Sequence, residues 1–321
     1  MSRGLSRPPS RAVPLSRRSA VVIAIASVAG LMMLVWPLLV RQPTGETVGP
    51  PFVFLLLLPV VIVVVLTEVT EGGVDPRVLA VLGVLSAITA VLRGISPGTA
   101  GVELVFFLLI LAGRVFGAGF GFVLGCTALF TSALLTGGVG PWLPYQMLCS
   151  GWVGMGAGLL PRRVTGRAEI AMLAAYGVVA AYAYGLLLNL SSWPFVLGIG
   201  VPGHAGLAFV PGDPLADNLH RFLVYSLLTS TGTFDTGRAI TNALAIVLLG
   251  PAVLASLRRT ARRVVVTGAV APDPVEKALP PPLGPPSVGP TDDPSARKPS
   301  RKEAAMSPSP TGLRSEAGSH P

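Results

Sequence analysis

Long runs without charge alternate with short polar segments along the first 263 residues. Eight of these runs are candidate membrane-spanning helices: residues 19–40, 52–67, 78–93, 102–113, 116–136, 145–160, 168–190 and 238–257. A bilayer core of about 30 Å needs about 20 apolar residues in a helix, so the run 102–113 must tilt or rely on neighbouring helices. Residues 219–229 form a further, half-length apolar segment after a Gly- and Pro-rich loop at 191–217. The pattern predicts an all-α polytopic membrane protein.

Small residues recur at spacings of three and four in three of the predicted helices. They are Gly83, Ser86, Ala87 and Ala90 in the first, Gly117, Gly121 and Gly125 in the second, and Gly151, Gly154, Gly156 and Gly158 in the third. Such stripes let two helix backbones approach closely. We therefore expect tight helix–helix contacts at these positions.

The two ends of the chain differ in composition from the predicted helices. Residues 1–18 carry five Arg among Ser and Pro, and residues 264–321 contain 13 Pro and no apolar periodicity. Such compositions do not support a packed core. The sequence thus predicts a disordered basic arm at 1–18, two extra transmembrane helices within 19–75, a six-helix membrane core at 76–263 and a disordered Pro/Ser-rich tail at 264–321.

The net charge of +9, with a pI of about 10.4, has two interpretations, nucleic-acid binding and membrane topology. Only 12% of the residues are charged and 51% are hydrophobic, whereas soluble proteins carry about a quarter charged residues. With the N-terminus inside, the eight-span scheme places 14 Arg on cytoplasmic segments and four on outer loops. Lys and Arg favour the cytoplasmic side. The charge therefore predicts a plasma-membrane protein with both termini in the cytoplasm and no nucleic-acid partner.

Polar and aromatic residues gather at the ends of the predicted helices that face outward. They are Glu103, Trp142, Tyr145, Gln146, Asn189, Trp193, Asn218, Arg221 and Tyr225. Convergence of such groups on one membrane face is typical of a small-molecule pocket. Alternatives remain: Trp and Tyr are common interface anchors, Glu103 could pair with Arg93, and Gln146 and Asn189 could bond to the backbone of a neighbouring helix.

Sequence signatures of enzymes are missing from the chain. It contains no G-x-x-x-x-G-K-[ST], H-E-x-x-H or G-x-S-x-G motif, which argues against a nucleotide-binding loop, a zinc protease and a hydrolase nucleophile. Cys126 and Cys149 lie in apolar runs, so we expect them to be buried as small hydrophobic side chains. The sequence predicts no catalytic residue, no metal site and no cofactor.

Two stretches in the middle of the chain carry a resemblance to a known family. They read GTAGVELVFFLLILAGRVFGAGFGFVLGCTALFTSALLTGG and GPWLPYQMLCSGWVGMGAGLLP. A short helix led by Glu103, a turn with Arg114 and Gly117, a Gly-rich helix and a Pro-Trp entry to the next helix follow one another. From about residue 76 to 259, this order resembles the substrate-specific S components of energy-coupling factor (ECF) transporters of the vitamin-uptake type.

The resemblance implies a six-helix membrane subunit that binds a small-molecule substrate at the outer face. It also implies two kinds of partner, a transmembrane T component and two ABC-type ATPases. The family carries an Ala-x-x-x-Ala pattern that contacts the T component, and this chain has Gly83-x-x-x-Ala87 and Ser86-x-x-x-Ala90 in its place. Gly83, Ser86, Ala87 and Ala90 are then the expected contact residues. The substrate would be an organic vitamin, with cobalamin as the first candidate, and the first two helices lie outside the resemblance.

Other classes of function stay open from the sequence alone. A non-catalytic membrane scaffold or assembly protein would retain no small molecule. A secondary transporter typically contains inverted repeats, and none is visible in the chain. An intramembrane enzyme would need a converging pair of acid-base or metal-binding groups within the helices.

Overall fold

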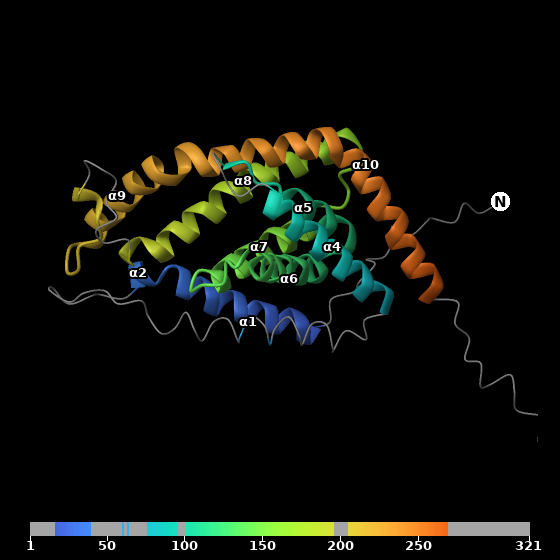
Figure 1. Ribbon diagram of the computed structural model, residues 1–321, viewed down its shortest axis with the longest axis horizontal. Helices are drawn as coiled ribbons and strands as arrows, with labels where there is room; N and C mark the ends of the chain where they lie inside the picture. The colour runs from blue at the N-terminus through green and yellow to red at the C-terminus, as the bar shows by residue number, and fades with distance from the viewer. Residues whose placement is uncertain are drawn as a thin grey trace, which may run out of the picture. The chain divides into compact units, whose positions relative to one another are not determined.

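The computed structural model describes residues 17–39, 60, 63, 76–95, 101–195 and 205–268 (Figure 1). Within these ranges the regular secondary structure is helical, which confirms the predicted all-α fold. The predicted helix 52–67 apart from residues 60 and 63, most of the basic arm and the tail beyond residue 268 lie outside the described residues. The predicted division into domains therefore stays a prediction.

The helices follow the predicted apolar runs closely. Their bounds are α1 Arg17–Leu34, α2 Trp36–Leu39, α4 Pro76–Ile95, α5 Val105–Phe116, α6 Ala118–Thr136, α7 Leu143–Leu159, α8 Arg167–Ser192, η2 Trp193–Phe195, η3 Ala205–Leu207, α9 Leu215–Ser226, η4 Leu227–Asp235 and α10 Thr236–Gly268. Four helical stretches are long and apolar enough to cross a membrane: Pro76–Ile95, Ala118–Thr136, Arg167–Ser192 and Leu215–Arg263. The chain is thus a multi-pass membrane protein.

Helix α5 lies at the centre of the bundle and packs against α6, α7 and α10 (Figure 1). Eleven of its 12 residues are buried. At 1.5 Å per residue it is only about 18 Å long, which is too short to cross a bilayer alone. Because neighbouring helices cover it on all sides, its length need not match the hydrocarbon core, and the expected help from neighbours is confirmed.

Glycines bring α5, α6 and α7 into backbone contact. A Cβ added at Gly113 or Gly121 would collide with the carbonyl group of Gly154, and one at Gly125 would collide with that of Ser150. Gly158 packs in the same way against the start of α6. The stripes on α6 and α7 therefore form the tight contacts predicted from their spacing.

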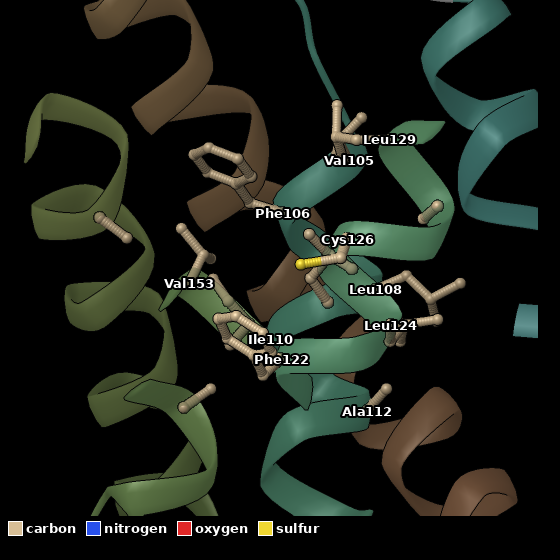
Figure 2. Packing of buried hydrophobic residues seen from close by; sticks show 14 of the residues in the cluster. Val105, Phe106, Leu108, Ile110, Ala112, Phe122, Leu124, Cys126, Leu129 and Val153 are labelled. Atoms are coloured by element: carbon tan, nitrogen blue, oxygen red, sulfur yellow. The ribbon is translucent and has the colours of Figure 1, made fainter. Parts of the chain in front are cut away.

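Both cysteines are buried and reduced, as predicted. Figure 2 shows Cys126 among apolar side chains that include Ile110, Phe122 and Val153. Its environment is thus that of a small hydrophobic residue.

The last helical run differs from the prediction. Residues 219–229 were expected as a separate half-length segment and the final helix from residue 238, but α9, η4 and α10 follow one another without a break. The middle piece, η4, is a π-helix rich in Ser and Thr. Thr229 Oγ1 and Thr236 Oγ1 donate to the carbonyls of Tyr225 and Thr231 at 2.7 and 2.6 Å. These bonds help to accommodate the wider turn, so polar residues here mark a distortion of the helix and not its end.

Helix α1 packs on the bundle through its small and apolar side. Gly30 lies against Leu148 of α7, and Trp152 Nε1 donates to Ser27 Oγ at 2.8 Å. After the bend at Val35, Trp36 Nε1 donates to the carbonyl of Ser191 on α8 at 3.3 Å. The predicted first helix is therefore an integral part of the bundle.

The glycine contacts predict a local difference in tolerance. Gly154→Ala should destabilise the protein by about 1–3 kcal/mol because the added methyl group would force the backbones of α6 and α7 apart. Gly94→Ala is the matched control, since a Cβ there would meet no atom within 4 Å. Thermal unfolding in detergent measures both variants. Equal melting temperatures would contradict the close contact.

Candidate functional site

The nine predicted site residues lie at one end of the bundle, where α4, α6 and α8 finish and α5, α7 and α9 begin. We call it the α8–α9 end, and the opposite end the α7–α8 end (Figure 1). The structure does not gather the nine residues into one group. They belong to three neighbouring groups, which differ in what the side chains contact.

The first group is the charge cluster, made of Glu103, Asp235 and Arg238. Arg238 Nε lies 2.6 Å from Glu103 Oε2, and its Nη1 lies 3.0 Å from Asp235 Oδ1. The guanidinium also lies over the rings of Phe106 and Tyr184, at 5.6 and 4.9 Å from their centroids. The alternative that Glu103 pairs with Arg93 is thus wrong, because α10 supplies the partner.

Local backbone features hold the charge cluster in place. Gly101 has a φ of +78° and packs against the backbone of Phe234, which turns the chain into α5 beside η4. Asn242, fully buried, accepts from the N–H of Phe107 at 2.6 Å and donates to the carbonyl of Glu103 at 2.7 Å. This amide caps α5, which has no side-chain cap of its own.

The position of the Asp235 side chain requires a glycine at position 185 of the facing helix α8. Its carboxylate lies directly against Gly185 of α8, where any Cβ would occupy the same space. Ser230 Oγ donates to Asp235 Oδ2 at 2.8 Å, and the residue is only 1% exposed. Sequence reasoning missed Asp235 and Asn242. An acid and an amide inside an apolar helical run were the signal that could have found them.

The second group is the α8–α9 connection, whose apolar core consists of Leu190, Trp193, Phe209 and Phe222. Trp193 Nε1 donates to the carbonyl of Leu207 at 2.9 Å. Val35, Leu38 and Tyr225 pack around this core. Three of the predicted residues therefore meet here in a small hydrophobic cluster or beside it: Trp193, Asn218 and Tyr225.

Polar side chains of the same group fasten the connection. Asn218 bonds to both the N–H and the carbonyl of Val210, at 3.0 and 2.9 Å. Arg221 pairs with Asp213 at 2.7 Å, and Asn189 Nδ2 donates to Ser226 Oγ at 2.9 Å. Asn189 thus joins α8 to α9 by bonding to the side chain of Ser226, and not to the backbone of a neighbouring helix.

The third group lies where α6 turns into α7. Trp142 is 55% exposed and donates to the carbonyl of Gly138, a placement that fits an interface anchor. Tyr145 is buried. Gln146 Oε1 accepts from Arg93 Nη2 at 3.0 Å, so its partner is a side chain of α4 and not a backbone group.

The α7–α8 end carries an ion cluster of its own, which the sequence reasoning did not identify. Glu169 Oε1 accepts from Arg114 Nε and from Arg258 Nη2, both at 2.7 Å. Arg114 also donates to the carbonyls of Leu160 and Val164 at 3.0 Å. Glu169, the single acid at the start of α8, thereby joins α5, α8, α10 and the α7–α8 loop.

The small residues of α4 divide between two sides of the helix. Gly83 and Ala87 are exposed, and a Cβ at Gly83 would meet nothing within 4 Å. Ser86 and Ala90 are buried, and the Ser86 hydroxyl bonds to Thr127 Oγ1 of α6 at 2.8 Å. The expectation that Ser86 and Ala90 contact a partner is therefore wrong, because they take part in packing within the chain.

Comparison with known proteins adds one match. The family model for the ECF transporter, substrate-specific component, matches residues 77–270, more than half of the chain. It covers the bundle from α4 onward and leaves out α1 and α2. Curated proteins gave no match, and neither did solved structures.

The charge cluster predicts unequal effects for its members. Arg238→Gln should cost about 3–5 kcal/mol, because two carboxylates would stay buried without a counter-charge. Glu103→Gln should cost less, since Arg238 would still pair with Asp235. Thermal unfolding in detergent measures these changes.

Arg221→Gln is the control for Arg238→Gln, because it removes a guanidinium from a more exposed ion pair. Its pair with Asp213 has side chains 25% and 35% exposed, so the expected cost is about 1 kcal/mol or less. Equal melting temperatures for Arg238→Gln and Arg221→Gln would contradict the central role of the charge cluster.

Proposed function

We propose, from the premise that the chain belongs to the substrate-specific components of ECF transporters, that it captures a vitamin-like organic micronutrient for import. Cobalamin is the first candidate substrate. The observation that carries the proposal is the concentration of buried polar and aromatic groups at the α8–α9 end, which is more extensive than the single ion cluster around Glu169 at the α7–α8 end. Intramembrane polar groups are costly, so their clustering favours a binding role.

The substrate site of this proposal lies between α4, α5, α7, α8 and α10. Arg93 and Gln146 border it from α4 and α7, and Arg238 borders it from α10. The rings of Phe106 and Tyr184, which pack edge to face with centroids 4.9 Å apart, supply apolar surface. A mixture of aromatic rings, an amide and fixed charges suits an organic molecule with both apolar and polar parts.

The proposed orientation places the α8–α9 end outside the cell and both termini in the cytoplasm. Basic residues support it. Among the described residues, eleven Arg belong to the α7–α8 end and three to the α8–α9 end, namely Arg93, Arg221 and Arg238. An excess of Lys and Arg marks the cytoplasmic side of membrane proteins.

Energy for import would come from partners, a T component and two ABC-type ATPases, since the sequence has no nucleotide-binding loop. The exposed face of α4 supports a docking role for two of the four residues expected there. Gly83 and Ala87, with Ala80 one turn before them, offer a flat strip on which another helix could pack closely.

Gly83→Leu and Ala87→Leu should disrupt association with the T component, because a branched side chain would fill the strip. Co-expression with the T component and ATPases, followed by affinity purification, measures the association. Ala175→Leu, at an exposed position on α8, is the matched control and should leave recovery of the complex unchanged. Normal recovery with both α4 variants would rule out this docking face.

Cobalamin can be tested directly as the substrate. Purified protein incubated with cyanocobalamin should co-elute with its visible absorbance in size-exclusion chromatography. Absence of co-elution would remove cobalamin as the candidate while leaving other organic micronutrients to be identified by mass spectrometry.

A further inference from the structure

Arg93 differs from the other arginines whose side chains reach into the bundle. Arg114 and Arg238 each lie within 3.0 Å of a carboxylate oxygen, and so do Arg221 and Arg258 at the helix ends. Arg93 has no carboxylate within salt-bridge distance among the described residues. Within the described ranges, its charge is therefore balanced by no acidic side chain.

Neutral side chains hold the Arg93 guanidinium in a fixed position. Its Nη1 donates to Ser132 Oγ at 3.3 Å, and its Nη2 donates to Gln146 Oε1 at 3.0 Å. Ser132 is fully buried on α6, and Gln146 is partly buried on α7. These two bonds use two of the five N–H groups of a guanidinium. Among the described residues no bond is formed by the remaining N–H groups, which could therefore bind a ligand.

Arg93 lies near the same helix ends as the charge cluster, because α4 ends shortly before the segment that carries Glu103 into α5. Its bonds to Ser132 and Gln146 join polar groups of α4, α6 and α7. The two carboxylates of the charge cluster share Arg238, whereas Arg93 contributes a positive charge that no carboxylate of the described residues neutralises.

We propose that Arg93 binds an anionic oxyacid group, a carboxylate or a phosphate, of the imported molecule. The proposal rests on the proposed function and narrows the substrate to organic anions, which disfavours cobalamin in its electrically neutral cyano form. A guanidinium presents parallel N–H groups that match the two oxygens of such a group. Arg93 is partly buried, and a cation removed from water without a counter-charge is costly, so a ligand that supplies the negative charge gains affinity from neutralising it. Ser132 and Gln146 are positioning residues, which orient Arg93 from the protein side.

The test presents purified protein with a low-molecular-mass cell extract, divided by anion exchange into an anionic fraction and a fraction of neutral and cationic compounds. Retained compounds are identified by mass spectrometry after gel filtration. Wild-type protein should retain a compound from the anionic fraction. Arg93→Gln should reduce the amount of retained compound by about tenfold or more. Arg93→Lys should recover part of the binding, because lysine restores the positive charge but lacks the parallel N–H groups of the guanidinium.

Arg77→Gln is the matched control, because it removes a guanidinium from the other end of α4. It should retain the compound as wild type does, and melting temperatures should show that all variants are folded. Retention of a neutral or cationic compound, equal in wild type and Arg93→Gln, would overturn the inference and leave the proposed function standing. No retained compound from either fraction would overturn both.

A phospholipid could supply the same phosphate chemistry, and a second arm separates the two sources. Wild type and Arg93→Gln are reconstituted in nanodiscs of phosphatidylglycerol and analysed by native mass spectrometry. The inference predicts equal numbers of bound lipids in the two proteins. A lipid lost from Arg93→Gln, with retention of the soluble compound unchanged, would assign Arg93 to a lipid headgroup and overturn the inference.

Discussion

Charge buried among apolar helices must be neutralised, and this constraint determines how the two ends of the bundle are joined. At the α8–α9 end, Arg238 of α10 binds Glu103, which precedes α5, and Asp235 of η4. At the α7–α8 end, Glu169 of α8 binds Arg114 of α5 and Arg258 of α10. Both clusters connect α5 and α10, which are more than 100 residues apart in sequence. Removing the shared member of a cluster, Arg238 or Glu169, would leave its partners without their counter-charge, so each cluster helps to fix the relative position of its helices.

Between the two clusters, packing depends on the absence of side chains. Gly113, Gly121 and Gly154 allow α5, α6 and α7 to touch through their backbones. Interhelical attraction in a membrane comes mainly from such close packing and from hydrogen bonds, because lipid is as apolar as the side chains. The centre of the bundle is therefore closely packed, while Ala80, Gly83 and Ala87 form a strip of small residues that is exposed in the described part of the chain. The proposed function uses both features, a closely packed bundle and a separate face on which a partner could pack.

The sequence predicted the helices well, because long apolar runs determine them almost alone. It also predicted the stripes of α6 and α7 and the burial of both cysteines. Ser86 and Ala87 show where such reasoning ends. Side chains at adjacent positions of a helix point in directions about 100° apart. Ser86 therefore faces α6 while Ala87 faces outward. The spacing of small residues does not reveal which of the two is buried. The partner of Glu103 was missed for a related reason, since only the fold brings Arg238 to it. Polar residues in η4 suggested a break because a π-turn and a loop have similar composition.

The central claim is that the chain is a subunit that binds an organic molecule within its own helices. Native mass spectrometry of the wild-type protein, extracted from membranes in mild detergent, tests this most directly. The account predicts one organic molecule per chain, released when the protein is unfolded and identified in the same experiment. A folded protein that carries no organic molecule other than lipid and detergent, even after growth with the full range of vitamins, would contradict it.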